Sequence, residues 1–126
     1  MRTRREAADL PAFLTRWEAT LVVERGKVAG TEYALEQPKV VLGRGQDADV
    51  HFDDTEMSAE HAVVEFTGEG FRVCDLGSTN GTRVNGEAVN ARDLEGGDRL
   101  ELGRHALRLR IEPRSRAPRV YCLPDD

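Results

Sequence analysis

The sequence is poor in cysteine and has no long hydrophobic run. Its two cysteines, Cys74 and Cys122, lie far apart and form no pair of the kind that binds a metal. Cys74 belongs to an apolar, strand-like run and is expected to be a small core residue, so we expect a reduced, cytoplasmic protein. No apolar stretch approaches the roughly 20 residues of a membrane-spanning helix, and the basic N-terminus lacks the apolar segment of a secretory signal. We therefore expect neither membrane insertion nor secretion.

Positive charge is also scarce relative to negative charge. The 126 residues include 18 Lys and Arg against 23 Asp and Glu, which gives a formal net charge of −5. Proteins that bind nucleic acids or anionic membranes without sequence preference rely on an excess of Lys and Arg. We therefore expect no nucleic-acid partner, although this balance leaves room for a small local basic site. The length fits a single domain.

Helical periodicity is confined to one N-terminal stretch, residues 6–17. Its apolar stripe consists of Leu10, Phe13, Leu14 and Trp17. Pro11 would have to lie in the first turn of such a helix, where proline is tolerated. The stretch is short for an independent helix, and the sequence is compatible both with a short docked helix and with the remnant of a linker.

The rest of the chain is dominated by short β-type runs. They are residues 21–23, 32–35, 39–42, 50–52, 62–66, 71–74, 82–85, 99–102 and 107–111. Turn signals separate them at residues 25–27, 68–70, 80–81, 85–86, 95–98 and 103–104. Many short strands at this spacing predict an all-β sandwich or barrel. Because no helical pattern falls between the strands, a doubly wound α/β sheet is disfavoured.

These patterns divide the chain into three parts. Residues 1–19 form an N-terminal extension with a possible short helix, and residues 20–112 form the β domain. Residues 113–126 form a C-terminal tail with Pro113, Pro118 and Pro124, which we expect to be extended or disordered. There is no internal repeat and no low-complexity tract.

Residues 43–48 resemble a dinucleotide-binding fingerprint at first sight. Gly43-Arg44-Gly45 follows an apolar run and precedes Ala48, which gives the pattern G-x-G-x-x-A. That fingerprint needs a helix after the glycines, because the amides of the helix N-terminus hold the phosphates. Here another strand-like run follows, so we do not expect a nucleotide site.

Polar side chains gather in three loops between the predicted strands: residues 43–45, 55–61 and 75–82. Loops of a β-sandwich meet at its ends, so residues distant in sequence can converge. Together these loops offer a guanidinium, several hydroxyls and an amide. Arginine binds phosphate through a planar fork, and Ser or Thr hydroxyls donate to the remaining oxygens. An Asn amide both donates and accepts, which suits a peptide backbone. The loops therefore predict a site for a phosphate dianion.

Four motifs in the same order make this prediction more specific. They are Gly43-Arg44, Ser58-x-x-His61, Gly-Ser-Thr-Asn-Gly-Thr at residues 77–82, and Val84-Asn-Gly86. With Asp49-Val50 and residues 97–103 on their flanks, they resemble the forkhead-associated (FHA) domain family over residues 21–111. The resemblance implies an eleven-stranded β-sandwich whose loops bind phosphothreonine peptides, and it implies no catalysis. It suggests a reader or adaptor in Ser/Thr kinase signalling of the bacterial type, without a cofactor.

Within this resemblance, each matched position carries an expected role. Arg44 and Ser58 would contact the phosphate, and Thr79 would assist while shaping a pocket for the threonine methyl group. Asn80 would hydrogen-bond the peptide backbone. Structural support would come from Gly43, His61 and Gly81, with His61 bracing the loop that presents Ser58.

Two neighbouring positions bear on peptide selectivity. Members of the family often have Arg, Lys or Asn directly after the serine, where this chain has Ala59, so one phosphate or peptide contact is missing. Glu56 lies where the family can read a side chain downstream of the phosphothreonine. An acidic residue there would disfavour acidic peptides and favour a basic or neutral side chain.

Other interpretations of these residues compete with phosphate binding. Ser58, His61 and Asp75 could suggest a hydrolase, but there is no G-x-S-x-G nucleophile elbow and no evident oxyanion hole. Five residues could suggest a metal loop: Asp47, Asp49, His51, Asp53 and Asp54. This stretch lacks the central glycine and distal glutamate of a calcium loop, and its apolar alternation predicts a strand with a wet acidic face. We therefore expect neither an enzyme nor a metal site.

Two further hypotheses concern partners. Thr3, Thr15 and Thr20 could be kinase targets that dock back into the phosphate site, although their flanking residues show no clear acidic kinase motif. A Ser/Thr kinase is itself a possible partner. The alternative function is a scaffold that keeps the fold and binds a partner through a sheet face, independently of phosphate.

Overall fold

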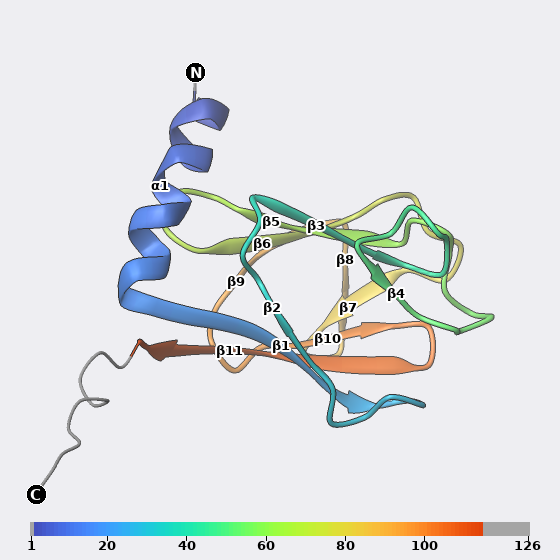
Figure 1. Cartoon of the computed structure of the whole chain (residues 1–126). Helices are drawn as coiled ribbons and strands as arrows, with labels where there is room; N and C mark the ends of the chain where they lie inside the picture. Colours follow the sequence, from blue (N-terminus) through green and yellow to red (C-terminus); the bar gives the residue numbers. More distant parts are fainter. Residues whose placement is uncertain (1, 115–126) are drawn as a thin grey trace, which may run out of the picture.

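The computed structural model describes residues 2–114, which form one N-terminal helix and eleven strands (Figure 1). The helix α1 spans Arg2–Arg16. The strands are β1 (Trp17–Arg25), β2 (Glu32–Ala34), β3 (Lys39–Gly43), β4 (Val50–His51), β5 (Ala62–Phe66), β6 (Phe71–Asp75), β7 (Thr82–Val84), β8 (Glu87–Val89), β9 (Ala91–Leu94), β10 (Arg99–Leu102) and β11 (His105–Pro113).

The strands form two sheets that pack face to face. The six-stranded sheet has the order β2-β1-β11-β10-β7-β8, and the five-stranded sheet has the order β4-β3-β5-β6-β9. The strand pairs are antiparallel except β3 and β4, which run parallel. The prediction of an all-β sandwich with a short N-terminal helix is confirmed.

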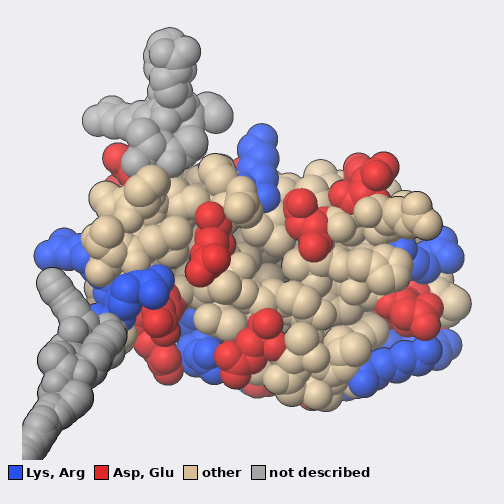
Figure 2. Space-filling view, viewed as in Figure 1, with Lys and Arg blue, Asp and Glu red and all other residues tan. Residues whose placement is uncertain are grey.

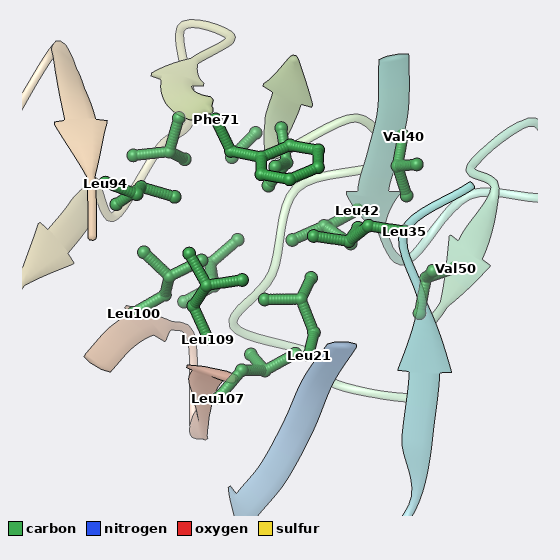
Figure 3. Packing of buried hydrophobic residues seen from close by; sticks show 14 of the residues in the cluster. Leu21, Leu35, Val40, Leu42, Val50, Phe71, Leu94, Leu100, Leu107 and Leu109 are labelled. Atoms are coloured by element: carbon green, nitrogen blue, oxygen red, sulfur yellow. The ribbon is translucent and has the colours of Figure 1, made fainter. Parts of the chain in front are cut away.

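The core lies between the sheets and follows from side-chain alternation. In β11, Leu107 and Leu109 point inward and Arg108 points outward, as the alternating sequence predicts. Leu21 of the neighbouring strand β1 and Leu42 of β3 in the opposite sheet belong to the same core (Figure 3), and all four leucines are 0% exposed. Burying such a side chain contributes about 1.5–3 kcal/mol, so the contact between the sheets dominates the stability of the fold.

The helix α1 closes one end of the sandwich. Leu10 is buried, and the Phe13 ring lies 5.3 Å from the ring of Phe66 and 5.6 Å from that of Phe71. Arg114, just after β11, donates from Nε to the Leu14 carbonyl at 2.6 Å and so satisfies a carbonyl in the last turn of the helix. In Figure 1, α1 lies at the end of the sandwich opposite the loops that follow β3 and β4.

The element boundaries differ from the prediction at both ends of the chain. The helix begins at Arg2, so Pro11 lies in its interior, where the exposed ring leaves one helical hydrogen bond unmade. Trp17 opens β1 and pairs with Pro113 of β11, which places both residues in the sheet. Residues 115–126, with Cys122, Pro118 and Pro124, lie outside the described residues. The division into three parts stays a prediction.

No helix in the described part of the chain is long and apolar enough to cross a membrane.

Candidate functional site

The three polar loops lie together at the end of the sandwich away from α1 (Figure 1). The first follows β3, the second joins β4 to β5, and the third joins β6 to β7. The first two are joined through their backbones, since Arg44 N–H donates to the Ser58 carbonyl at 3.0 Å and Gly45 N–H to the Ala59 carbonyl at 2.9 Å. These bonds fix the position of Arg44 relative to Ser58.

Gly43 permits this close approach of the two loops. A Cβ atom at position 43 would lie 2.1 Å from the Ala59 carbonyl oxygen and 2.8 Å from its carbon. Both atoms belong to the backbone and cannot swing aside. Only glycine therefore fits at this position, which gives a physical reason for the expected structural role of Gly43.

We expect Gly43→Ala to lower both the free energy of unfolding and the affinity for any ligand of these loops. Overpacking of this kind costs about 1–3 kcal/mol, and the displaced second loop would carry Ser58 away from Arg44. Urea unfolding followed by circular dichroism measures the first effect. Gly70→Ala is the matched control, because an added Cβ there meets nothing within 4 Å. Equal stability of the two variants would contradict the prediction.

The Arg44 side chain is exposed and makes few contacts with the rest of the protein. Its Nε donates to the Met57 carbonyl at 3.2 Å. Among the side chains that the structure describes it forms no ion pair with a carboxylate, unlike Arg72 and Arg104. One edge of the guanidinium is thus oriented by the protein, and the terminal N–H groups remain for an anion.

Ser58 is oriented by two backbone contacts. Its Oγ accepts a hydrogen bond from Thr79 N–H at 3.0 Å, so the hydroxyl proton can point to a ligand. Its own N–H donates to Nδ1 of His61 at 3.1 Å. Since Nδ1 accepts, Nε2 must carry the proton, and it donates to the Gly81 carbonyl at 2.7 Å. His61, which is 0% exposed, thereby links the second loop to the third.

Asn80 and Gly81 complete the junction between these two loops. Asn80 Nδ2 donates to the Glu56 carbonyl at 2.8 Å, which leaves its Oδ1 free to accept a peptide N–H. Gly81 has φ +84°, a conformation in which other residues are strained. The Glu56 side chain lies 3.3 Å from Arg104. The charge of Glu56 is thus paired in the structure, and the expectation that Glu56 disfavours acidic peptides stays a prediction.

Asp75 organises the third loop, a role that was not predicted. Its Oδ1 accepts from the hydroxyls of Ser78 at 2.5 Å and Thr82 at 2.7 Å, and its Oδ2 accepts from the N–H groups of Gly77 and Ser78 at 3.0 Å. Burial alone would raise the pKa of Asp75, but these hydrogen bonds outweigh it and lower the pKa. An Asp three residues before a Ser is a turn signal that the sequence did contain.

Asp54 plays the same part in the second loop and was also missed. It is 3% exposed, and its carboxylate accepts from Glu56 N–H at 2.9 Å, Arg104 N–H at 2.7 Å and His105 Nδ1 at 2.7 Å. Burial opposes ionisation, yet the hydrogen bonds from His105 and the two amides lower the pKa of Asp54. The second loop is thereby fastened to the turn between β10 and β11.

The structure does not assemble a hydrolase from Ser58, His61 and Asp75. His61 contacts the Ser58 amide and not its hydroxyl, and Asp75 binds Ser78 and Thr82 and not the imidazole. The three residues therefore form no nucleophile–base–acid relay.

The acidic stretch 47–54 is likewise divided among separate partners. Asp49 accepts from Val41 N–H, Asp53 pairs with Lys27, and Asp54 binds His105. No group of three or more His, Cys, Asp or Glu side chains among the described residues is placed to hold a metal ion. The glycines of residues 43–45 lead into β4 and not into a helix, so the geometry of a dinucleotide site is not formed there.

The charges on the visible face of the molecule are mixed. In Figure 2, Lys and Arg side chains alternate with Asp and Glu side chains, with no large area of one sign. This face therefore offers no extended area of one charge for a partner of the opposite charge.

Known proteins are similar to this chain in both sequence and fold. Residues 22–112 match the family described as the inner membrane component of T3SS, cytoplasmic domain (Yop-YscD). The glycogen accumulation regulator GarA of Mycolicibacterium smegmatis is 41% identical over 97 residues, 77% of this chain and 61% of that protein. The oxoglutarate dehydrogenase inhibitor of Corynebacterium glutamicum is 40% identical over 101 residues, 80% of this chain and 68% of that protein. The chain thus spans about three-fifths of the length of the first relative.

Solved structures of FHA domains have a similar fold. One from a study of phosphothreonine-dependent FHA domain interactions superposes with a TM-score of 0.70 at 34% identity, and covers 76% of this chain and 98% of that one. The FHA domain of FhaA, crystallised with the intracellular domain of Rv3910, gives a TM-score of 0.67 at 35% identity, and covers 73% of this chain and 99% of that one.

Proposed function

Because the chain belongs to the forkhead-associated domain family, we propose that its loop end binds phosphothreonine in partner proteins. The observation that carries the proposal is Arg44, an exposed arginine without a carboxylate partner among the described residues, held beside Ser58 by backbone hydrogen bonds. An oriented cation next to a free hydroxyl proton suits a phosphate dianion. The protein would act as a reader in Ser/Thr kinase signalling.

The contacts proposed for the ligand follow from the donors that remain available. Arg44 would donate from its terminal guanidinium nitrogens to two phosphate oxygens, and the Ser58 hydroxyl would donate to a third. Thr79 would line the pocket for the threonine methyl group and assist with the phosphate. Oδ1 of Asn80 would accept a backbone N–H of the peptide, since its Nδ2 is engaged with the Glu56 carbonyl.

The ligand-binding loops need not move far to form this site. Their mutual hydrogen bonds already place the guanidinium, the hydroxyl and the amide at one end of the sandwich. Binding a peptide to preformed donors saves the free energy of ordering them. Ala59 supplies no side-chain donor, so we expect affinity to depend on Arg44 and Ser58 more heavily than in relatives with a basic residue there.

The comparisons with known proteins support phosphothreonine binding, and they identify no particular partner of this chain. The relatives are described as a regulator and as an enzyme inhibitor, and one neighbouring structure comes from a study of phosphothreonine-dependent interactions. We propose a non-enzymatic, cytoplasmic adaptor whose partner carries phosphothreonine, with the kinase that writes this mark as a second candidate partner.

Calorimetry with a matched set of peptides tests the proposal. A phosphothreonine peptide selected from a degenerate library is compared with its phosphoserine and unphosphorylated forms. Charge-assisted hydrogen bonds contribute about 1.5–3 kcal/mol each, so removal of the phosphate should abolish measurable binding. The phosphoserine form should bind more weakly because it lacks the methyl group. Equal binding of the phosphorylated and unphosphorylated peptides would reject the proposal.

A further inference from the structure

Two of the three asparagines in this chain, Asn80 and Asn85, are followed directly by glycine. Asparagine before glycine is especially prone to spontaneous deamidation, because glycine has no side chain to keep the Asn carboxamide away from its backbone nitrogen. Gly81 and Gly86 have similar backbone conformations, with φ +84° and φ +89°. A difference in reactivity between the two asparagines is therefore expected to come from the way in which their side chains are held.

The Asn85 side chain is held at both ends. Its Nδ2 donates to Oδ1 of Asp98 at 3.0 Å, and its Oδ1 accepts from Arg99 N–H at 3.0 Å. The N–H of Asn85 also donates to the Arg99 carbonyl at 2.8 Å, so this residue is tied to the start of β10 at three points. The carboxamide cannot turn toward the nitrogen of Gly86 unless both side-chain hydrogen bonds break.

The Asn80 side chain is held at one end. Its Nδ2 donates to the Glu56 carbonyl at 2.8 Å, and none of the residues that the structure describes donates to its Oδ1. The N–H of Gly81 donates to Ser78 Oγ at 2.9 Å, and this contact must open before the nitrogen can react. One side-chain hydrogen bond thus restrains Asn80 where two restrain Asn85, and both asparagines are exposed to water.

Deamidation of Asn80 needs no reagent other than water. The Gly81 nitrogen gives its proton to solvent and attacks Cγ of Asn80. The Cγ–Nδ2 bond breaks, and Nδ2 takes up a proton from solvent and leaves as ammonia. Water then opens the five-membered succinimide ring at either of its two carbonyl carbons. The product is aspartate or isoaspartate at position 80, and nothing is oxidised or reduced.

Either product would damage the site formed by the loops. The donor to the Glu56 carbonyl is lost, and a carboxylate oxygen in its place repels that carbonyl, so the junction of the second and third loops is weakened. The new negative charge lies next to Thr79 and would repel a phosphate dianion. Isoaspartate also adds one carbon to the backbone and displaces Gly81.

We propose that Asn80 is a deamidation site whose reaction switches off the reader, and that a bound phosphothreonine peptide protects it. The protection rests on the proposed function, in which a peptide N–H donates to Oδ1 of Asn80. Asn80 would then be held at both ends, as Asn85 is in the free protein. Readers engaged with a partner would keep their affinity, and idle readers would lose it with time.

Incubation of the full-length protein at mildly alkaline pH, where the amide nitrogen loses its proton more readily, tests the assignment. Peptide mapping by mass spectrometry follows the conversion of amide to carboxylate at positions 80 and 85 separately. Position 80 should convert several times faster than position 85, and a synthetic peptide of residues 77–82 should convert faster than either. Conversion at 85 as fast as at 80, or an intact Asn80 after the synthetic peptide has reacted, would overturn the proposal.

A phosphothreonine peptide at saturating concentration should slow the conversion at position 80 and leave that at position 85 unchanged. Position 85 is therefore an internal control for the conditions of incubation. The unphosphorylated form of the peptide should protect neither position. Unchanged conversion at position 80 in the presence of a peptide that binds would reject protection by the ligand.

The variant Asn80→Asp reproduces one product and should bind the phosphothreonine peptide more weakly by about tenfold or more. Asn90→Asp is the matched control, because Asn90 is exposed between β8 and β9 and its replacement adds the same charge. This control should bind like the wild type. Wild-type affinity in Asn80→Asp would show that deamidation does not switch off the reader.

Failure of the inference and failure of the proposed function are distinguishable. If binding requires the phosphate and Arg44 but Asn80 stays intact or is not protected, the inference is rejected alone. If Asn80 converts faster than Asn85 but no peptide binds in a phosphate-dependent way, the deamidation site is correct, and the proposed function and the switch are rejected together.

Discussion

Replacing Arg44 by alanine should weaken the binding of a phosphothreonine peptide by at least tenfold. The guanidinium would make charge-assisted hydrogen bonds with the phosphate, worth about 1.5–3 kcal/mol, and about 1.4 kcal/mol corresponds to a factor of ten. Calorimetry measures the loss. The midpoint of thermal unfolding should hardly change, because the Arg44 side chain is exposed and donates to a single carbonyl, that of Met57.

Two further variants show whether the loss of peptide affinity in Arg44→Ala comes from the planar pair of guanidinium donors or from the positive charge alone. Arg44→Lys keeps the positive charge and loses the planar pair of donors, so it should bind with intermediate affinity. Arg83→Ala removes an exposed arginine of β7 and should leave binding unchanged. If Arg44→Ala bound the natural partner as well as the wild type, the alternative of a phosphate-independent scaffold would be correct.

Replacing Asp54 by alanine should lower the free energy of unfolding by about 3–5 kcal/mol, the cost of removing one member of a buried pair. Asp54 is 3% exposed and accepts from Glu56 N–H, Arg104 N–H and His105 Nδ1. His105 would lose its partner inside the protein, and the two part-buried amides would lose theirs. Urea unfolding measures the change. Asp53→Ala is the control, since the Asp53 side chain is 80% exposed and forms a surface ion pair with Lys27.

The same substitution should alter the response to acid. Burial opposes ionisation of Asp54, but the hydrogen bonds from His105 and the two amides lower its pKa in the folded protein. The carboxylate therefore stabilises the fold fully above the unfolded value of about 3.9. This contribution is lost as the pH falls through the lower folded value. Below about pH 4 the wild type should lose stability more steeply than Asp54→Ala, and the other carboxylates whose pKa is lowered, among them Asp75, supply the remaining slope. Parallel acid curves for the two proteins would contradict the assignment.

The strands of the core were predictable because their side chains alternate regularly. The expected strands at residues 62–66 and 99–102 coincide with β5 and β10. The strands β8 and β9 were missed among the short runs. They lie at the edges of their sheets, and Glu87, Ala88 and Asp93 are exposed. A strand with little buried surface has no apolar alternation by which to recognise it.

The helix was predicted from its apolar stripe, but its length was not. The stripe marks the residues that pack on the sandwich, such as Leu10 and Phe13. The first turns extend beyond that contact to Arg2, where the periodicity carries no information. Pro11 also misled the prediction, because an exposed proline can occupy a helix interior at the loss of one hydrogen bond.

The candidate ligand-binding residues were identified from their motifs, whereas the residues that hold the loops in place could be predicted only in part. Arg44, Ser58, Thr79 and Asn80 lie together in the structure, and their roles toward a ligand stay predictions. Asp75 could have been found from its Ser78 neighbour. The link from Asp54 to His105 could not, because the two residues lie 51 positions apart, and a contact between distant segments leaves no local pattern. The Glu56–Arg104 pair escaped for the same reason.

The three loops are joined mainly through backbone carbonyls, those of Ser58, Ala59, Gly81 and Glu56. A carbonyl is present whatever side chain its residue carries. Exposed side chains such as Gln46, Asp47 and Glu60 can therefore be exchanged during evolution without undoing the frame that orients Arg44. The side chains around the site can thus change while the frame that orients Arg44 is retained, so that gene duplication can multiply the partners of such a domain while one recognition chemistry persists.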